Sequence, residues 1–340
     1  MSKLIETDAL IIGAGPVGLF AVFELGLLNI NCHVIDILDK PGGQCAQLYP
    51  EKPIYDIPAY PMISGKDLTD KLLLQIKPFS PVFHFEELAK DLKKNNDGTW
   101  HISTKKGLNF HAKVIIIAAG GGSFEPKKPN IPNLEKYFDQ VRYSIDQIDN
   151  FKNKDIVILG GGDSALDWTV QLNEIVKSLT LIHRRDVFRG SPATVNKVMD
   201  LRDKGEIKFH VGQVNNIIGS NGILDAVQCE KKEGILEIPC DILMPFFGLT
   251  MSLGPVEKWG LNLLEDRVSV STETFQTSVP GIYAVGDINT YPGKLKLILS
   301  GFHETALMAH AVFKYINPEE RLTLQYTTTS SSLQKKLLAK

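Results

Sequence analysis

A glycine-rich run near the N-terminus has the residue spacing of a phosphate-binding turn. Residues 13–18 read GAGPVG, so Gly13, Gly15 and Gly18 fit the pattern G-x-G-x-x-G. In that pattern the first glycine allows a tight turn, the second lets a pyrophosphate approach the backbone, and the third lets a helix pack closely on a strand. The helix that follows directs free N–H groups at the phosphates. These residues therefore indicate nucleotide binding.

An acidic residue further along the chain indicates the type of nucleotide. Asp36 stands 23 positions after Gly13, at the end of the next apolar run. A carboxylate at this place accepts hydrogen bonds from ribose hydroxyls and repels a 2′-phosphate. The alternative, a structural turn followed by a surface aspartate, leaves the joint occurrence of turn, strands and acid unexplained. We predict a site for FAD or NAD rather than for NADP.

A second glycine-rich run repeats the pattern with the opposite charge. Residues 160–165 read GGGDSA, which fits G-x-G-x-x-A, and the same offset of 23 positions from Gly160 leads to His183 and two arginines. A guanidinium presents several donors to a phosphate, and an arginine here accommodates the 2′-phosphate of NADP. A solvated basic loop is the alternative interpretation. The predicted NADPH site consists of Gly160, Gly162, Asp163, Ser164, Arg184, Arg185 and Arg189.

Both turns require a strand before them and a helix after them, and the sequence supplies these elements. Apolar runs of strand length occupy residues 9–12, 32–35, 114–118, 156–159, 179–182, 242–246 and 282–285, and helical patterns occupy residues 17–28 and 164–176. Continuous apolar runs that alternate with helices are typical of parallel α/β sheets. We predict an α/β protein with two Rossmann-like, three-layer dinucleotide-binding domains.

The composition disfavours several other classes of protein. The 340 residues include 37 Lys and Arg against 39 Asp and Glu, a balance that disfavours a nucleic-acid partner. Four cysteines occur without a CxxC, so we expect no metal site and a reducing, cytoplasmic location. Residues 9–28 are long and apolar enough to span a membrane, but their glycines favour a strand, a turn and a buried helix. We therefore expect no membrane association.

Two nucleotide sites of opposite ribose preference in one chain suggest a flavoprotein. In such a protein NADPH delivers a hydride to FAD, and the cofactor carries the chemistry while the protein orients it. No catalytic side chain is required, and the sequence shows no Ser–His–Asp or paired-carboxylate arrangement. A non-catalytic flavin sensor is the less favoured reading, because a sensor has no need of an NADPH site.

The order of motifs along the chain resembles that of the two-domain thioredoxin reductase-like flavoproteins. Asp36 is followed by residues 42–44 (GGQ), 115–120 (IIIAAG), the second glycine run with its arginines, and 282–287 (IYAVGD). The resemblance implies an FAD domain, residues 1–119 and 251–340, interrupted by an NADPH domain, residues 120–250. It also implies that Asp287 hydrogen-bonds the ribityl chain of FAD and that the protein is a homodimer.

One departure from that family narrows the expected activity. Thioredoxin reductase carries a CxxC shortly before the second glycine turn, but residues 141–149 here read VRYSIDQID. Without a dithiol, electrons must pass from FAD directly to an outside acceptor. Cys45 has no partner nearby in the sequence, so we expect it to be a buried structural cysteine rather than a redox thiol.

Within the superfamily the chain looks most like the ferredoxin–NADP reductases of the thioredoxin reductase-like type. Residues 42–50 (GGQCAQLYP), 54–58 (IYDIP) and 120–126 (GGGSFEP) carry this resemblance, together with a Thr/Ser-rich C-terminal extension. It implies that Tyr49 stacks on the flavin, and Tyr326 is our candidate for its second face. With the glycines of the first turn, the predicted FAD site consists of Gly13, Gly15, Gly18, Asp36, Gln44, Tyr49, Ala89, Phe124, Asp287, Tyr326 and Thr328.

The resemblance implies an acidic electron-carrier protein as partner, either ferredoxin or flavodoxin. Ferredoxins are generally acidic, so a basic docking patch is expected near the flavin. The candidate lysines for it are Lys127, Lys128, Lys294, Lys296, Lys335 and Lys336. An NADPH-dependent reductase of a low-molecular-weight disulfide or of a quinone would use the same cofactors and stays open as an alternative.

Overall fold

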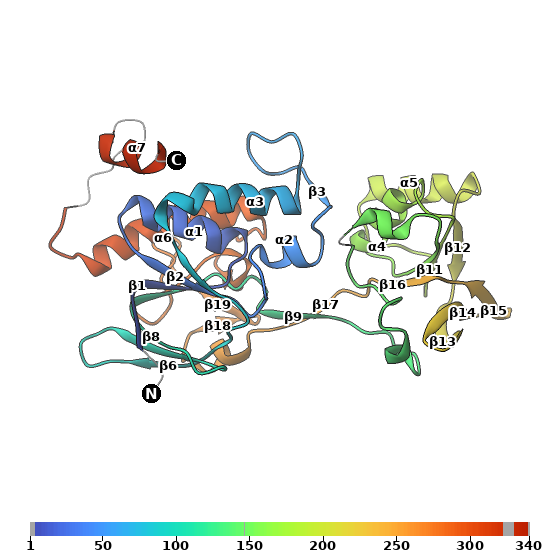
Figure 1. The fold of residues 1–340 in the computed structure, drawn as a ribbon, viewed down its shortest axis with the longest axis horizontal. Coiled ribbons are helices and arrows are strands. Elements are labelled where there is room, and N and C mark those ends of the chain that lie inside the picture. The colour runs from blue at the N-terminus through green and yellow to red at the C-terminus, as the bar shows by residue number, and fades with distance from the viewer. Residues whose placement is uncertain (1–3, 146, 322–329, 339–340) are drawn as a thin grey trace. The chain divides into compact units, whose positions relative to one another are not determined.

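The computed structural model describes residues 4–145, 147–321 and 330–338, and the chain in it forms two compact units (Figure 1). Unit 1 comprises Met1–Ser123 and Met251–Lys340, and unit 2 comprises Phe124–Thr250. The units divide after residues 123 and 250, where the sequence suggested divisions after 119 and 250. The strands β9 (Ser123–Pro126) and β17 (Leu249–Ser252), which span the two crossings, pair with each other.

Unit 1 is built on one mixed sheet. Its order is β5-β2-β1-β8-β7-β6, and β20 pairs with the far end of β8. The parallel strands are β1 (Leu4–Ile12), β2 (Cys32–Ile35), β5 (Val82–His84), β8 (Asn109–Ile117) and β20 (Ile282–Ala284). The strands β6 (Ala89–Lys94) and β7 (Trp100–Thr104) extend the sheet in antiparallel fashion. The carboxyl ends of the parallel strands thus share one edge.

Three helices cover one face of this sheet. Figure 1 shows α1 (Pro16–Leu27), α3 (Gly65–Ile76) and α6 (Ile298–Ile316) together over β1 and β2, and α1 packs against both other helices. Their buried side chains and those of the strands form one apolar core. A second core lies on the opposite face, closed by segments that include η4 (Gly254–Lys258) and β19 (Arg267–Ser269). Burial on both faces explains the unbroken apolar runs of β1 and β8.

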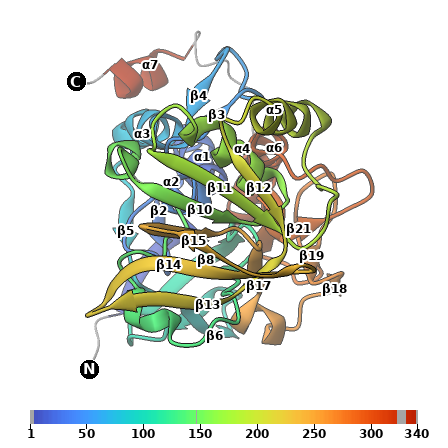
Figure 2. The same cartoon turned by 90° about the vertical axis from the view of Figure 1, so that its right-hand side faces the viewer.

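Unit 2 has a smaller parallel sheet with a different covering on each face. The order is β12-β11-β10-β16, with β10 (Asp155–Leu159), β11 (Ser178–His183), β12 (Lys208–Val211) and β16 (Ile242–Pro245). Figure 2 shows α4 (Asp163–Leu172) and α5 (Pro192–Asp203) on one side of these strands. The other side carries an antiparallel sheet of β13 (Gln213–Ser220), β14 (Ile223–Lys231) and β15 (Gly234–Pro239). Both faces are buried, in two separate cores.

The structure corrects several expected elements. The helix expected over residues 164–176 ends at Leu172, whose carbonyl accepts hydrogen bonds from the N–H groups of Ile175 and Val176 in a closing turn. The β13–β15 sheet was not predicted, although Asn221 and Gly222 between two strand-like runs are a hairpin signal, and both have positive φ. The terminal segment contains a helix, α7 (Ser331–Leu338).

Residues 9–28, the candidate membrane span, are divided between the end of β1, the glycine turn and α1. Across the part of the chain that the structure describes, every helix is too short or too polar to cross a bilayer.

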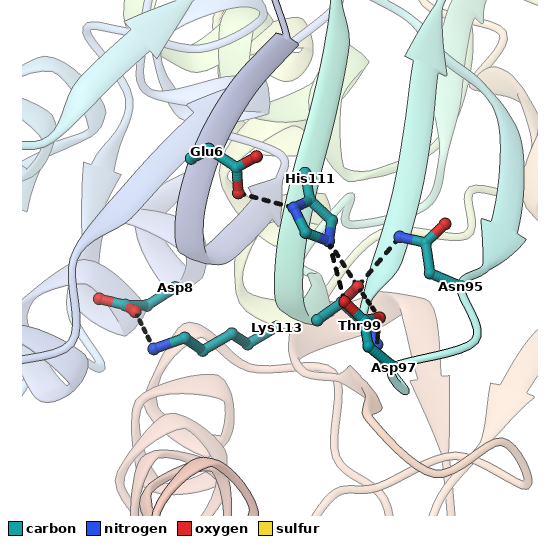
Figure 3. Close-up of polar contacts among 7 residues, drawn as sticks. All are labelled: Glu6, Asp8, Asn95, Asp97, Thr99, His111 and Lys113. Carbon is teal, nitrogen blue, oxygen red and sulfur yellow. Dashed lines mark hydrogen bonds and ion pairs between the residues drawn. The ribbon is translucent and has the colours of Figure 1, made fainter.

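A polar cluster at the sheet surface of unit 1 ties the β6–β7 turn to β1 and β8 (Figure 3). His111 on β8 lies with Nδ1 2.6 Å from a carboxylate oxygen of Glu6 and with Nε2 2.5 Å from the hydroxyl of Thr99. Acid, imidazole and hydroxyl follow one another as in a nucleophile triad. The Thr99 hydroxyl, however, donates its single proton to Asp97. It therefore has none to give the imidazole, and the cluster serves to link strands.

Candidate cofactor sites

The first glycine turn joins the end of β1 to the start of α1. Gly13 has φ of +109°, and a Cβ on it would collide with the carbonyl group of Ala118. A Cβ on Gly18 would overlap the carbonyl oxygen of Gly13. Both positions therefore require glycine, because the turn, the helix and the neighbouring strand approach at backbone distance.

The N-terminus of α1 offers a surface of bare backbone. Gly15 is its N-cap, and the first turn of the helix carries no acidic residue. Gly43 lies so near that a Cβ on it would be 3.0 Å from the Cα of Gly15. The free N–H groups of the first helical turn and the positive end of the helix dipole suit a pyrophosphate at this point.

Asp36 links the turn to the end of β2. Its side chain is almost completely buried, with 8% exposure. One carboxylate oxygen accepts a hydrogen bond from the N–H of Ala14 at 2.6 Å, and the other accepts from the N–H of Leu38 at 2.8 Å. Burial raises the pKa of Asp36, although these two N–H groups oppose the shift. Each oxygen keeps a lone pair for a further donor such as a ribose hydroxyl.

Glu87, which the sequence analysis missed, stands beside Asp36. Its N–H donates to the carbonyl oxygen of Asp36 at 2.8 Å, and its side chain is 8% exposed. The Oε2 atom is buried and has no hydrogen-bond partner among the described residues. Ala89, which opens β6, is also buried. An unused acceptor next to Asp36 fits the hydroxyl and amino donors of an adenosine. Burial reveals this residue, and no motif marks it.

The other end of the predicted FAD site gathers around Asp287. The thiol of Cys45 donates to the hydroxyl of Tyr49 at 3.7 Å. Burial raises the pKa of both groups, and the charge of Asp287 adds to the shift. Gln44 precedes Cys45 on α2 (Gly43–Gln47). Cys45 is 2% exposed, and burial is the main cause that raises its pKa to about 11. The prediction that Cys45 is buried is confirmed.

Asp287 lies in η5 (Gly286–Ile288), directly after β20, and is half-buried. Burial raises its pKa, and the cations Lys294 and Lys296 oppose the shift. Lys294 was expected on an exposed docking patch, and this expectation is wrong. Its side chain is 5% exposed because it forms an ion pair with Glu304, which is completely buried.

Of the remaining predicted FAD residues, only Phe124 lies in the part of the chain that the structure describes. Phe124 is half-buried in β9, at the first crossing between the units. Tyr326 and Thr328 lie outside the described residues.

The second glycine turn joins β10 to α4. Gly160 has φ of +145°, and a Cβ on it would lie 2.6 Å from the carbonyl oxygen of Phe246. A Cβ on Gly162 would meet no atom within 4 Å, so this face of the turn is open. Asp163 and Ser164 begin α4 and are exposed. The carboxylate of Asp163 accepts a hydrogen bond from the N–H of Ser191 at 2.8 Å, which ties the basic loop to the helix.

The arginines of the second site are free to meet a ligand. Arg184, Arg185 and Arg189 are exposed, and none forms an ion pair with another residue in the described ranges. The N–H of Arg189 donates to the carbonyl oxygen of Gly161 at 2.7 Å. The ring of His183 stacks on Phe188 and abuts Gly161. The loop is therefore held against the glycine turn, with its guanidinium groups in solvent.

A paired strand–glycine–helix scaffold, one half acidic and one half basic, defines a two-site dinucleotide oxidoreductase. The chain belongs to the pyridine nucleotide-disulphide oxidoreductase family, which matches residues 7–311. Within that family it groups with proteins named ferredoxin–NADP reductase. It is 58% identical to the one from Parvibaculum lavamentivorans over 98% of each chain, and 57% identical to the one from Mesorhizobium japonicum over 99% of each. The resemblance inferred from the motifs is confirmed.

Solved structures confirm the fold class. Lactococcus lactis thioredoxin reductase, in its FR conformation, has a TM-score of 0.74 and covers 92% of this chain and 99% of its own, at 24% identity. Thioredoxin reductase from T. acidophilum also has a TM-score of 0.74, at 22% identity, and covers 91% of this chain and 98% of its own.

Proposed function

We propose that this chain is a ferredoxin–NADP reductase that holds FAD in unit 1 and takes NADPH in unit 2. The observation that carries the proposal is the opposite charge of two equivalent positions. The end of β2 presents the buried Asp36, whereas the end of β11 presents Arg184 and its neighbours. A carboxylate rejects a 2′-phosphate and a guanidinium binds it, so the two turns select different nucleotides. The names of the relatives supply the acceptor.

In unit 1 the protein binds and orients the flavin cofactor. Bound FAD supplies the chemistry, because it accepts a hydride from NADPH and passes electrons on singly to a carrier protein. The N-terminus of α1 binds the pyrophosphate, and Asp36 and Glu87 accept hydrogen bonds from the adenosine half. Asp287 hydrogen-bonds the ribityl chain. Tyr49 packs on the flavin and excludes water from that face.

In unit 2 the protein binds and selects the reductant. Arg184, Arg185 and Arg189 bind the 2′-phosphate, and the open face at Gly162 admits the pyrophosphate to the N-terminus of α4. Asp163 acts indirectly, since its hydrogen bond to Ser191 fixes the loop that carries the arginines.

The acceptor side of the proposal is ferredoxin, with flavodoxin as a second carrier of the same kind. The four cysteines are buried and free, and the sequence has no CxxC through which electrons could pass first. Exposed lysines that could meet an acidic carrier are Lys127, Lys128, Lys296 and Lys335, and Lys336 stays a candidate from the sequence. A homodimer in the cytoplasm completes the proposal.

Steady-state and stopped-flow electron transfer test this function. NADPH is supplied, with NADH as control, and ferredoxin, flavodoxin, thioredoxin with a disulfide reporter, and a quinone are each tried as acceptor. Fast NADPH-specific reduction of ferredoxin supports the proposal. Rapid bleaching of the flavin without turnover on ferredoxin or flavodoxin contradicts it and favours a disulfide or quinone reductase. If NADPH does not bleach the flavin, the non-catalytic flavin sensor is the interpretation that remains.

A further inference from the structure

A completely buried charge sits under the turn that carries Asp287. Glu304 projects from α6 with 0% exposure and is surrounded by four donors. Its Oε1 accepts hydrogen bonds from Lys294 Nζ and, at 3.0 Å, from the hydroxyl of Tyr291. Its Oε2 accepts hydrogen bonds from the N–H of Gly286 at 2.6 Å and from the side-chain amide of Asn289 at 2.8 Å. Both carboxylate oxygens are thus satisfied by this one stretch of chain.

The ion pair holds both polar groups of a single backbone residue. Glu304 accepts from the N–H of Gly286, and Lys294 Nζ donates to the carbonyl oxygen of Gly286 at 2.9 Å. Gly286 has a φ of +80°, a left-handed conformation that glycine adopts without steric cost. The carbonyl of Gly286 belongs to the peptide that leads into Asp287. The orientation of that peptide sets the direction in which the Asp287 side chain leaves the backbone.

Stability alone does not account for such a pair. Replacing a buried ion pair by apolar side chains of similar volume is often neutral or stabilising, because both charges lose their hydration. The neighbouring positions in the core of unit 1 are filled by apolar side chains such as Met308 and Val312. A charged pair that grips the residue before Asp287 therefore points to a role at the ligand site.

We propose that Glu304 and Lys294 are positioning residues for FAD, which clamp Gly286 so that the Asp287 carboxylate meets the ribityl chain. The inference rests on the FAD role of Asp287 in the proposed function. Neither Glu304 nor Lys294 needs to touch the cofactor. Each acts through the backbone of Gly286, and the clamp requires both, since one holds the N–H and the other holds the C=O.

Two single variants and their double variant test the clamp. Lys294→Met and Glu304→Gln each leave one buried charge unpaired, so each is expected to lower the melting temperature of the apoprotein and to weaken FAD binding by about tenfold or more. The double variant holds no unpaired charge, and its melting temperature should recover. Its affinity for FAD should stay weak, because no donor reaches the carbonyl of Gly286. FAD titration of apoprotein and thermal unfolding give the two readouts.

Lys66→Met is the matched control, since Lys66 pairs with Asp70 on α3 in the same unit but is 60% exposed. It should change neither readout. Recovery of both readouts in the double variant overturns the clamp and leaves a purely structural pair. If a single variant does not fold, the double variant against the wild type decides between these outcomes.

Asp287→Ala separates this inference from the function on which it rests. Normal FAD affinity in Asp287→Ala overturns the assigned role of Asp287 itself. Weakened affinity in Asp287→Ala, together with normal affinity in the Lys294 and Glu304 variants, overturns the clamp alone.

Discussion

The two glycine turns share one backbone plan and differ in what surrounds it. In the first, α1 packs so closely that a Cβ at Gly18 would overlap the carbonyl oxygen of Gly13. In the second, the same motif position holds Ala165, so α4 leaves room for a methyl group. The first helical turn of α1 has no acid, whereas α4 begins with Asp163.

The selecting charges differ in burial as well as in sign. Asp36 is 8% exposed and hydrogen-bonded into the turn itself, while the three arginines are in solvent. A ligand bound at Asp36 is enclosed with it and suits a resident cofactor. A ligand bound by exposed guanidinium groups arrives and leaves through solvent, as a consumed substrate must. The degree of burial around each turn therefore distinguishes a site for a permanently bound nucleotide from a site for one that exchanges with solvent.

The largest effect is expected when the third motif position of the first turn, Gly18, is given the alanine that the second turn has at Ala165. Gly18→Ala should destabilise unit 1 by about 3 kcal/mol or more, because the added methyl group forces α1 away from β1. The protein should then be purified with little FAD. Ala165→Gly at the matching position is the control and should cost only about 1 kcal/mol through lost helix propensity. Thermal unfolding and flavin absorbance measure both, and equal losses in the two variants would contradict the difference in packing.

The next effect concerns the acid of the first site. Asp36→Ala removes the acceptor of two buried N–H groups and of the ribose, so FAD affinity should fall by about tenfold or more. NADPH binding in unit 2 should stay unchanged. Asp186→Ala removes an exposed acid from the basic loop and serves as the control for FAD titration. Unchanged FAD affinity in Asp36→Ala would show that Asp36 does not contribute to FAD binding.

A smaller effect is expected at the basic site. Arg184→Ala removes one set of charge-assisted hydrogen bonds to the 2′-phosphate and should raise the KM for NADPH by about tenfold, with that for NADH unchanged. Arg202→Ala, on α5, removes an arginine that pairs with Asp203 and should leave the ratio of the two constants as it was. A parallel loss for NADPH and NADH would show that Arg184 does not select the phosphate.

The smallest effect is a pH dependence near the first site. His33 Nδ1 and His84 Nε2 lie 2.9 Å apart, and the carbonyl of His84 accepts the N–H of Asp36. Burial lowers the pKa of both imidazoles from 6.5. As the pH falls below 6.5, the unfolded chain takes up protons first, so stability is lost with acidification. His84→Gln should flatten that loss in denaturant unfolding between about pH 7.5 and about pH 5.5, and an equally steep curve would exclude this pair as its source.

The sequence predicts the parts of the molecule that repeat a known physical pattern. Both strand–glycine–helix units appear as expected, since the glycine spacing and apolar runs are local signals. The order of the strands in each sheet is not local and could not be read from the runs alone. The β13–β15 sheet was missed because its strands mix polar and apolar residues without a regular period, a weaker signal than an unbroken apolar run.

The site shows the same limit. Glu87, Lys294 and Glu304 look like ordinary surface charges in the sequence, and the structure buries all three. Lys294 and Glu304 are recognised by each other, ten positions apart and outside any motif, whereas Glu87 is recognised by its burial alone. Lys294 was misread for this reason, because only its pairing with Glu304 explains its burial.

The pairing of β9 with β17 has a consequence for folding entropy. The chain leaves unit 1 through β9 and returns through β17, and these two strands are paired. Because paired strands lie about 4.8 Å apart, the two ends of the 127-residue insertion are close together. To the rest of unit 1, unit 2 is one very long loop, and closing such a loop costs entropy that grows with the logarithm of its length. Folding of unit 2 brings its own ends together and removes most of that cost. Once folded, unit 2 therefore holds the two stretches of unit 1, Met1–Ser123 and Met251–Lys340, close together at the point where the insertion begins and ends.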